Sequence, residues 1–102
     1  MAVYLIVAIH VDPARERITE VRWGEVDPDG LHFVEGTAIS DVLEVVDAIY
    51  AGNSVYAHRT VEGRIVPGPR IRTMIFDAGD EGIDIDDADL EEGHNWSVVD
   101  LF

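Results

Sequence analysis

The sequence predicts a small α+β domain: a mostly antiparallel sheet of four to five strands, one amphipathic helix packed on one face, and an acidic C-terminal segment. Three observations lead to this prediction. The chain of 102 residues has the size of one domain and is 47% hydrophobic. Its apolar residues follow strand periodicity in most segments and helical periodicity in one. Its acidic residues gather toward the C-terminal end.

The first part of the chain predicts two paired strands followed by a third. Residues 3–9 are apolar on both faces, which is typical of a central strand covered on both sides. Asp12-Pro13 then marks a turn, and residues 18–26 alternate between apolar and polar side chains, so the two segments are expected to form a hairpin. Asp27-Pro28-Asp29-Gly30 is a second turn signal, and residues 31–34 are expected to form a short third strand.

One helix is expected, beginning near Ser40 and ending at Gly52. Its apolar residues recur at spacings of three and four and form one stripe: Ile39, Val42, Leu43, Val46, Ile49 and Tyr50. Ser40 or Thr37 can cap the first amides of the helix, and Gly52 suits the left-handed conformation that ends many helices.

The segments after this helix predict a second group of strands. Residues 55–61 form one strand, and Glu62-Gly63 is a tight turn into residues 64–66. Pro67-Gly68-Pro69 is expected to interrupt the sheet, because a proline offers no amide hydrogen to a neighbouring strand. Residues 70–76 then resume as a strand.

The chain divides by charge after Phe76. Residues 1–76 contain 11 acidic residues and all seven arginines, whereas residues 77–102 contain 10 acidic residues and no arginine. We therefore predict a core domain at 1–76 and an acidic segment at 77–102. Apolar residues close this segment, and its C-terminus is expected to dock back on the core. These residues are Trp96, Val98, Val99, Leu101 and Phe102.

The net charge of −14 indicates which classes of binding partner are unfavourable. The chain has 21 acidic residues, seven arginines and no lysine, so direct binding to nucleic acid or to an anionic membrane is not expected. Three causes fit this balance: adaptation to high intracellular salt, a GC-rich genome that replaces lysine with arginine, and an acidic face that meets a basic partner. The first two together are favoured, because a charge excess is usually a solvated surface.

No segment predicts a membrane span or an export signal. The longest apolar run has seven residues, whereas a spanning helix needs about 20. The absence of cysteine excludes disulfides and cysteine-based zinc sites. A cytoplasmic location is expected, and the sequence carries no signal for an oligomeric state.

No catalytic, cofactor or metal motif stands out in the sequence. Nine carboxylates fall within residues 77–92, but neither Asp77 nor Asp84 starts a loop with the spacing of an EF-hand. The four histidines lie far apart, no serine stands in a Gly-x-Ser-x-Gly motif, and no lysine is available for a Schiff base or a phosphate loop. We expect no cofactor, and enzymatic activity is not favoured.

Four arginines form the candidate binding surface. They are Arg59, Arg64, Arg70 and Arg72, on two strands that are expected to be adjacent. One interpretation is a cationic face that binds an anionic ligand, or the carboxylates of a partner, through bidentate contacts. The favoured interpretation is that these arginines pair with the protein's own acids. A linked hypothesis is that residues 77–92 fold back over the arginines and screen them.

Short motifs resemble a known family. Arg17-Ile18-Thr19-Glu20-Val21 after a first apolar strand, Val46-x-x-Ile49-x-x-Gly52 before Val55-Tyr56, and Ile71-Arg72-Thr73 are similar to the short prokaryotic domains of unknown function numbered 3892. The likeness covers roughly residues 3–76, and the Asn-Leu and Leu-Pro motif that usually closes the family is replaced here by the acidic segment. The resemblance implies an α+β fold and brings no activity.

Three functions stay open on this basis. The favoured one is a non-catalytic interaction or ligand-binding module, because the sequence predicts a well-formed core without a reactive group of residues. The second is an acidic nucleic-acid mimic that inhibits a DNA-binding protein, with carboxylates in place of phosphates. The third is a small metal-dependent enzyme.

Overall fold

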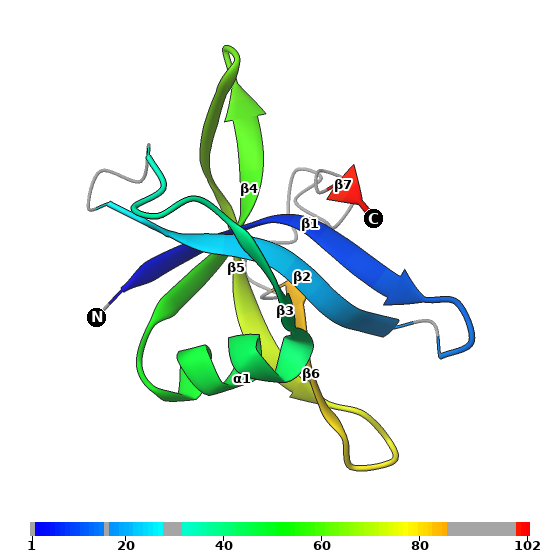
Figure 1. The fold of residues 1–102 in the computed structure, drawn as a ribbon. Helices are drawn as coiled ribbons and strands as arrows, with labels where there is room; N and C mark the ends of the chain where they lie inside the picture. Colours follow the sequence, from blue (N-terminus) through cyan, green and yellow to red (C-terminus); the bar gives the residue numbers. More distant parts are fainter. Residues whose placement is uncertain (1, 16, 28–31, 86–99) are drawn as a thin grey trace.

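The computed structural model shows a strongly twisted sheet with one helix against it (Figure 1) and describes residues 2–15, 17–27, 32–85 and 100–102. The elements in chain order are β1 (Val3–Asp12), β2 (Arg17–Val26), β3 (Ala38–Asp41), α1 (Val42–Tyr50), β4 (Ser54–Val61), β5 (Arg64–Ile75), β6 (Glu81–Ile85) and β7 (Asp100–Leu101). The α+β class, the helix and the sheet are as predicted.

The topology of the sheet corrects two parts of the prediction. The strands run in the order β3-β2-β1-β4-β5-β6, and β7 pairs with β1 outside this path, so the sheet has seven strands rather than four to five. It is also mixed, because β1 is antiparallel to β2 but parallel to both β4 and β7. A parallel pair needs a crossover connection, and β3 with α1 carries the chain from β2 across to β4.

Helix α1 is capped by a residue that the sequence pattern did not single out as the cap. Oδ1 of Asp41 accepts a hydrogen bond from the amide of Leu43 at 2.9 Å, which satisfies one of the free donors of the first turn. Ser40, the expected start of the helix, instead belongs to β3, which pairs with the outer edge of β2. Gly52 has a φ of 96°, so the left-handed stop is confirmed.

The buried face of α1 is rotated relative to the predicted stripe. The residues of α1 that pack on the core are Val42, Val45, Val46 and Ile49. Leu43 and Tyr50 belong to the predicted stripe but are exposed. The helical period was therefore predicted correctly, whereas the centre of the apolar face was wrong.

Two further strand predictions are corrected. Of residues 31–34, Leu31 lies outside the described residues and Phe33 makes only an isolated bridge with Val26, so the third strand is β3 instead. The proline-rich segment does not divide the following strand, since β5 is continuous through residues 67–69. A register shift in the β4–β5 pairing accommodates this segment.

The core joins α1 to five strands. Its buried members are Ile6, Ile9, Val21, Val42, Val45, Val46, Val55, Ala57, Ile71, Ile83 and Ile85. Ile83 and Ile85 belong to β6, so residues beyond position 76 contribute to the same core. The division of the chain at residue 76 stays a prediction.

The described C-terminal residues lie against β1. β7 pairs with Ala8 and Ile9, and the amide of Phe102 donates a hydrogen bond to the carbonyl of Ile9 at 3.0 Å. Trp96, Val98 and Val99, which were expected to dock with them, lie outside the described residues. In the part of the chain that the structure describes, no helix has the length and apolarity needed to cross a bilayer.

Candidate functional site

A groove of about 340 Å³ lies where the β1–β2 hairpin meets the β5–β6 hairpin. Figure 1 shows the end of β1, the start of β2 and the turn between β5 and β6 on the same side of the molecule. Nine of the described residues line the groove: seven are apolar, and the two charged ones are Arg17 and Asp84. The apolar lining comes from five strands and one turn, so no single segment of sequence contains it. We call this concavity the Arg17 groove.

The groove forms where the pairing of β1 with β4 ends. β4 pairs with β1 only as far as Ile6, and its outer part then projects away together with β5 (Figure 1). Beyond that point β1 pairs with β7, which has two residues. Val11 of β1 is therefore 38% exposed, and Leu101 of β7 is 72% exposed. Both apolar side chains line the groove.

Arg17 is held in place by two contacts. Its guanidinium carbon lies 4.0 Å from the centre of the Phe76 ring, and its Nη1 donates to Oδ2 of Asp80 at 3.2 Å. The side chain is 22% exposed, so these contacts act partly out of water and are stronger than they would be on an open surface. Arg17 also lines a second groove of about 390 Å³ with Arg15 and Asp41, and thus forms a wall between the two concavities.

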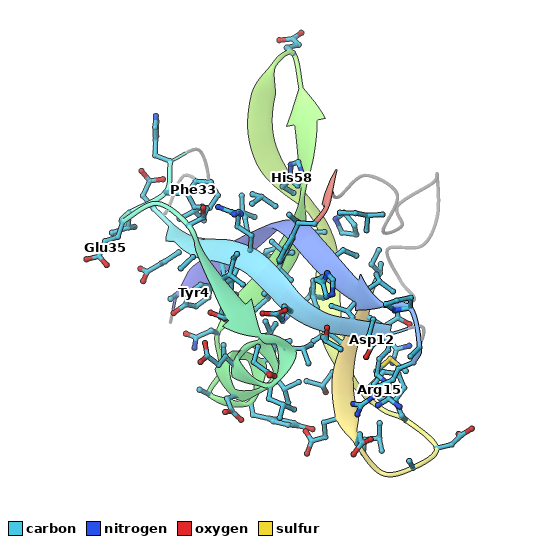
Figure 2. The ribbon with its side chains drawn as sticks, turned by 45° about the vertical axis from the view of Figure 1, so that its right-hand side comes forward. Tyr4, Asp12, Arg15, Phe33, Glu35 and His58 are labelled. Atoms are coloured by element: carbon cyan, nitrogen blue, oxygen red, sulfur yellow. The ribbon has the colours of Figure 1, made fainter. Side chains whose placement is uncertain are left out.

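One nitrogen of Arg17 makes no hydrogen bond within the described structure. This is Nε, which is buried. An unpaired buried donor is costly, so the position of the guanidinium depends on its stacking against Phe76 and its ion pair with Asp80. Figure 2 shows Asp12 and Arg15 at this same end of the β1–β2 hairpin.

Asp84, the second charged residue of the groove, is engaged by its neighbours. Nη2 of Arg72 lies 3.8 Å from Oδ2 of Asp84, and Oδ1 of Asp84 accepts from the amide of Ile85 at 2.8 Å. Nε of Arg72 also donates to the carbonyl of Ile85 at 3.4 Å. The ion pair with Arg72 and the hydrogen bond from the Ile85 amide hold the carboxylate of Asp84 in place.

The four arginines singled out by sequence lie along one long hairpin. Arg59 and Arg64 lie in its outer part, and their side chains are outside the described residues. Arg70 still pairs with β4, whereas Arg72 already pairs with β6. The contact between Arg72 and Asp84 agrees with pairing to the protein's own acids. An anion-binding surface that contains all four arginines stays a prediction.

The hypothesis that residues 77–92 screen the arginines can be compared with the structure only for residues 77–85. Asp84 contacts Arg72, so one acid of the segment lies against one of the four arginines. Asp80 contacts Arg17, which is not among the four. Residues 86–92 are outside the described residues, and the hypothesis for that segment stays a prediction.

The histidines are not gathered at the groove. Nδ1 of His10 is hydrogen-bonded to the carbonyl of Phe102, and His32 lies beside an aspartate. His58 on β4 is buried, and neither ring nitrogen has a partner in the described structure (Figure 2). His94 lies outside the described residues. Among the residues described, no group of three His, Asp or Glu side chains is placed to hold a metal ion.

The chain matches no family model, no curated protein and no solved structure. The resemblance to the domains of unknown function numbered 3892 stays a prediction. A proposal for function therefore has to come from the residues of the site.

Proposed function

We propose that the protein is a non-catalytic binding module that receives an apolar group of its ligand in the Arg17 groove. The observation that supports this proposal is the lining of the groove: seven of the nine described residues that line this concavity of about 340 Å³ are apolar. Ligand sites in proteins are concave, mostly apolar and roughly 300–1,000 Å³ in volume, with a few placed polar groups.

The two charged residues of the groove support binding rather than catalysis. Arg17 is stacked on Phe76 and paired with Asp80, and Asp84 is paired with Arg72. A general acid or base must reach a proton of the substrate, and a nucleophile needs a neighbouring base. The apolar residues that complete the lining offer neither.

The charge of the whole chain favours a ligand in which the apolar group is joined to a positively charged group. A net charge of −14 attracts cations over distances of about a Debye length, near 10 Å at moderate salt. We therefore propose that the natural ligand combines an apolar group with positive charge, as a basic amphipathic peptide does.

Three small probes test this proposal. Hexanol, hexylamine and heptanoate share one hexyl chain and differ in the charge of the head group. We expect saturable amide NMR shifts at Met74, Ile83 and Leu101 with hexanol and hexylamine, with hexylamine the tighter ligand at low salt. Absence of saturable shifts with all three probes would contradict the proposal.

Two tryptophan substitutions on β5 locate the binding site. Met74 lines the groove, whereas its neighbour Ile75 is 69% exposed and is not among the lining residues. Met74→Trp should weaken hexylamine binding by at least about tenfold, because the indole occupies the space that the alkyl chain needs. Ile75→Trp should leave it unchanged. Equal effects would place binding elsewhere, provided that both variants keep the melting temperature of the parent.

The other two functions receive no support from the described residues. A nucleic-acid mimic would use the clustered carboxylates of residues 77–92 in place of phosphates. Many of these carboxylates fall within residues 86–92, which the structure does not describe. A metal-dependent enzyme needs a cluster of ligands, and the described part of the chain holds no such group.

A further inference from the structure

A third concavity lies at the other end of the β1–β2 hairpin, away from both grooves that Arg17 lines. It has a volume of about 390 Å³ and lies between the start of β1, the end of β2 and the loop that leads into β3. Figure 2 shows Tyr4, Phe33 and Glu35 at this end and Asp12 and Arg15 at the opposite one. We call this concavity the aromatic pocket.

Two aromatic rings form one wall of the aromatic pocket. The rings of Tyr4 and Trp23 have their centres 4.7 Å apart and are tilted by 31°. Both residues are half-buried, so each is fixed by packing on the core and keeps part of its ring surface open. The faces of such rings carry negative electrostatic potential and attract cations, most strongly for tryptophan.

A close approach of two backbone segments also shapes the pocket. A Cβ atom on Gly24 would lie 2.2 Å from the carbonyl oxygen of Gly36 and 2.9 Å from Cδ1 of Phe33, so only glycine fits at this position of β2. The amide of Val34 donates to the carbonyl of Glu25 at 2.9 Å, which ties the loop to the strand. The pocket is therefore formed before any ligand arrives.

The charged side chains of the lining are both acidic. They are Glu25 and Glu35, which are exposed, and none of the described lining residues is an arginine or a histidine. Aromatic faces and carboxylates attract the same kind of ligand, and the net charge of −14 adds to this attraction at long range. A hard metal ion is less suited to this pocket, because it needs about six oxygen ligands and gains little from aromatic faces.

We propose that the aromatic pocket binds an organic cation of the methylated ammonium class. The methyl groups of such a cation pack on Tyr4 and Trp23, as in the aromatic cages that recognise choline and methylated lysine. Glu25 and Glu35 balance its charge at the rim. This site is separate from the Arg17 groove, and binding at either one does not depend on the other.

A matched pair of probes tests the role of the charge. Choline and 3,3-dimethyl-1-butanol have the same shape, and only choline is charged. We expect choline to give a saturable NMR shift of the Trp23 indole resonance, with affinity at least about tenfold higher than that of the neutral alcohol. Equal affinities, or no saturable shift with choline, would overturn the proposal.

Two double variants test the role of the carboxylates. Glu25→Gln with Glu35→Gln removes both charges from the pocket, whereas Glu44→Gln with Asp47→Asn removes two charges from exposed positions on α1. The first variant should weaken choline binding by about threefold or more at low salt and leave the alcohol unaffected, and the second should change neither. Equal weakening by the two variants would mean that choline responds only to overall charge, and would overturn the proposed site.

A third comparison distinguishes the source of the cation. A short peptide with one trimethyllysine is compared with the same peptide carrying unmodified lysine and with choline. Tighter binding of the trimethyllysine peptide than of choline indicates a side chain on a basic protein, and equal binding indicates a free small molecule. Equal binding of the two peptides would count against a methylated cation.

Discussion

The two halves of β1 have similar apolar sequences and different neighbours. Val3–Ile6 lies between β2 and β4, whereas Ala8 and Ile9 lie between β2 and the two-residue strand β7. Ile6 is fully buried, but Val11 is 38% exposed and opens onto the Arg17 groove. The comparison shows that an apolar strand becomes part of the core or the lining of an open groove according to what pairs beside it. Three predictions test this difference, in order of expected effect.

The largest effect is expected from shortening a buried side chain in the half of β1 that lies between β2 and β4. Ile6→Ala should lower the free energy of unfolding by about 2–5 kcal/mol, because it leaves a cavity in a close-packed core. Val11→Ala should lower it by less than about 1 kcal/mol, because Val11 is already partly in water. Urea unfolding of both variants at one salt concentration measures the difference. Equal losses would show that both halves are covered alike.

A smaller effect is expected from removing β7, the two-residue strand that pairs with Ala8 and Ile9 of β1. A chain without residues 100–102 loses the pairing of β7 with β1 and the bond from Phe102 to Ile9. The free energy of unfolding should fall by about 1–2 kcal/mol, at about 1 kcal/mol for each backbone hydrogen bond.

The control for this truncation is Leu101→Ala, which keeps the backbone pairing and removes only a side chain of the groove. It should preserve most of the stability and weaken hexylamine binding. Unchanged stability in the shortened chain would mean that β7 does not contribute to the fold.

The smallest effect is expected from removing the ion pair between Arg17 and Asp80, which lies beside the exposed end of β1. Asp80 is 62% exposed, so its pair with Arg17 is screened by water. Asp80→Asn should lower the free energy of unfolding by no more than about 1 kcal/mol at low salt, and by less at high salt. Asp77→Asn, an exposed acid at the start of the same turn, serves as the control and should cause no loss. A loss from Asp80→Asn that salt does not reduce would argue against an ionic origin.

Local order in this fold could be predicted from the sequence. The alternation in residues 18–26 predicted a hairpin with the first strand, and the pairing of β1 with β2 confirms it. The spacing of apolar residues predicted one helix, and Gly52 predicted its end. The helix begins at Val42, two residues after the expected start near Ser40, because Ile39 and Ser40 pair with β2, an interaction that local propensity does not contain.

Long-range order could not be predicted in the same way. The parallel pairing of Val3 with Ser54 joins residues separated by a hairpin, a third strand and a helix. The strand β6 did carry a local signal, since Ile83 and Ile85 alternate with Gly82 and Asp84. The acids around it are typical of a solvated segment and mask that alternation.

The candidate site shows the same limit. The arginines close in sequence lie along one long hairpin, whereas Arg17, which lines the groove, is distant in sequence from Phe76 and Asp80, which hold it. The groove brings together residues as far apart as Ile9 and Leu101. Only the packing of strands against each other determines such a set.

The parallel pairing of β7 with β1 has a practical consequence for fusion proteins. A polypeptide joined after Phe102 would emerge beside Leu101 and crowd the Arg17 groove, whereas one joined before Ala2 would emerge beside Tyr4 and crowd the aromatic pocket. We therefore expect an affinity tag at either end to obstruct one of the two proposed sites and to spare the other. Immobilising the protein by each end in turn would assign a captured ligand to its site without any substitution.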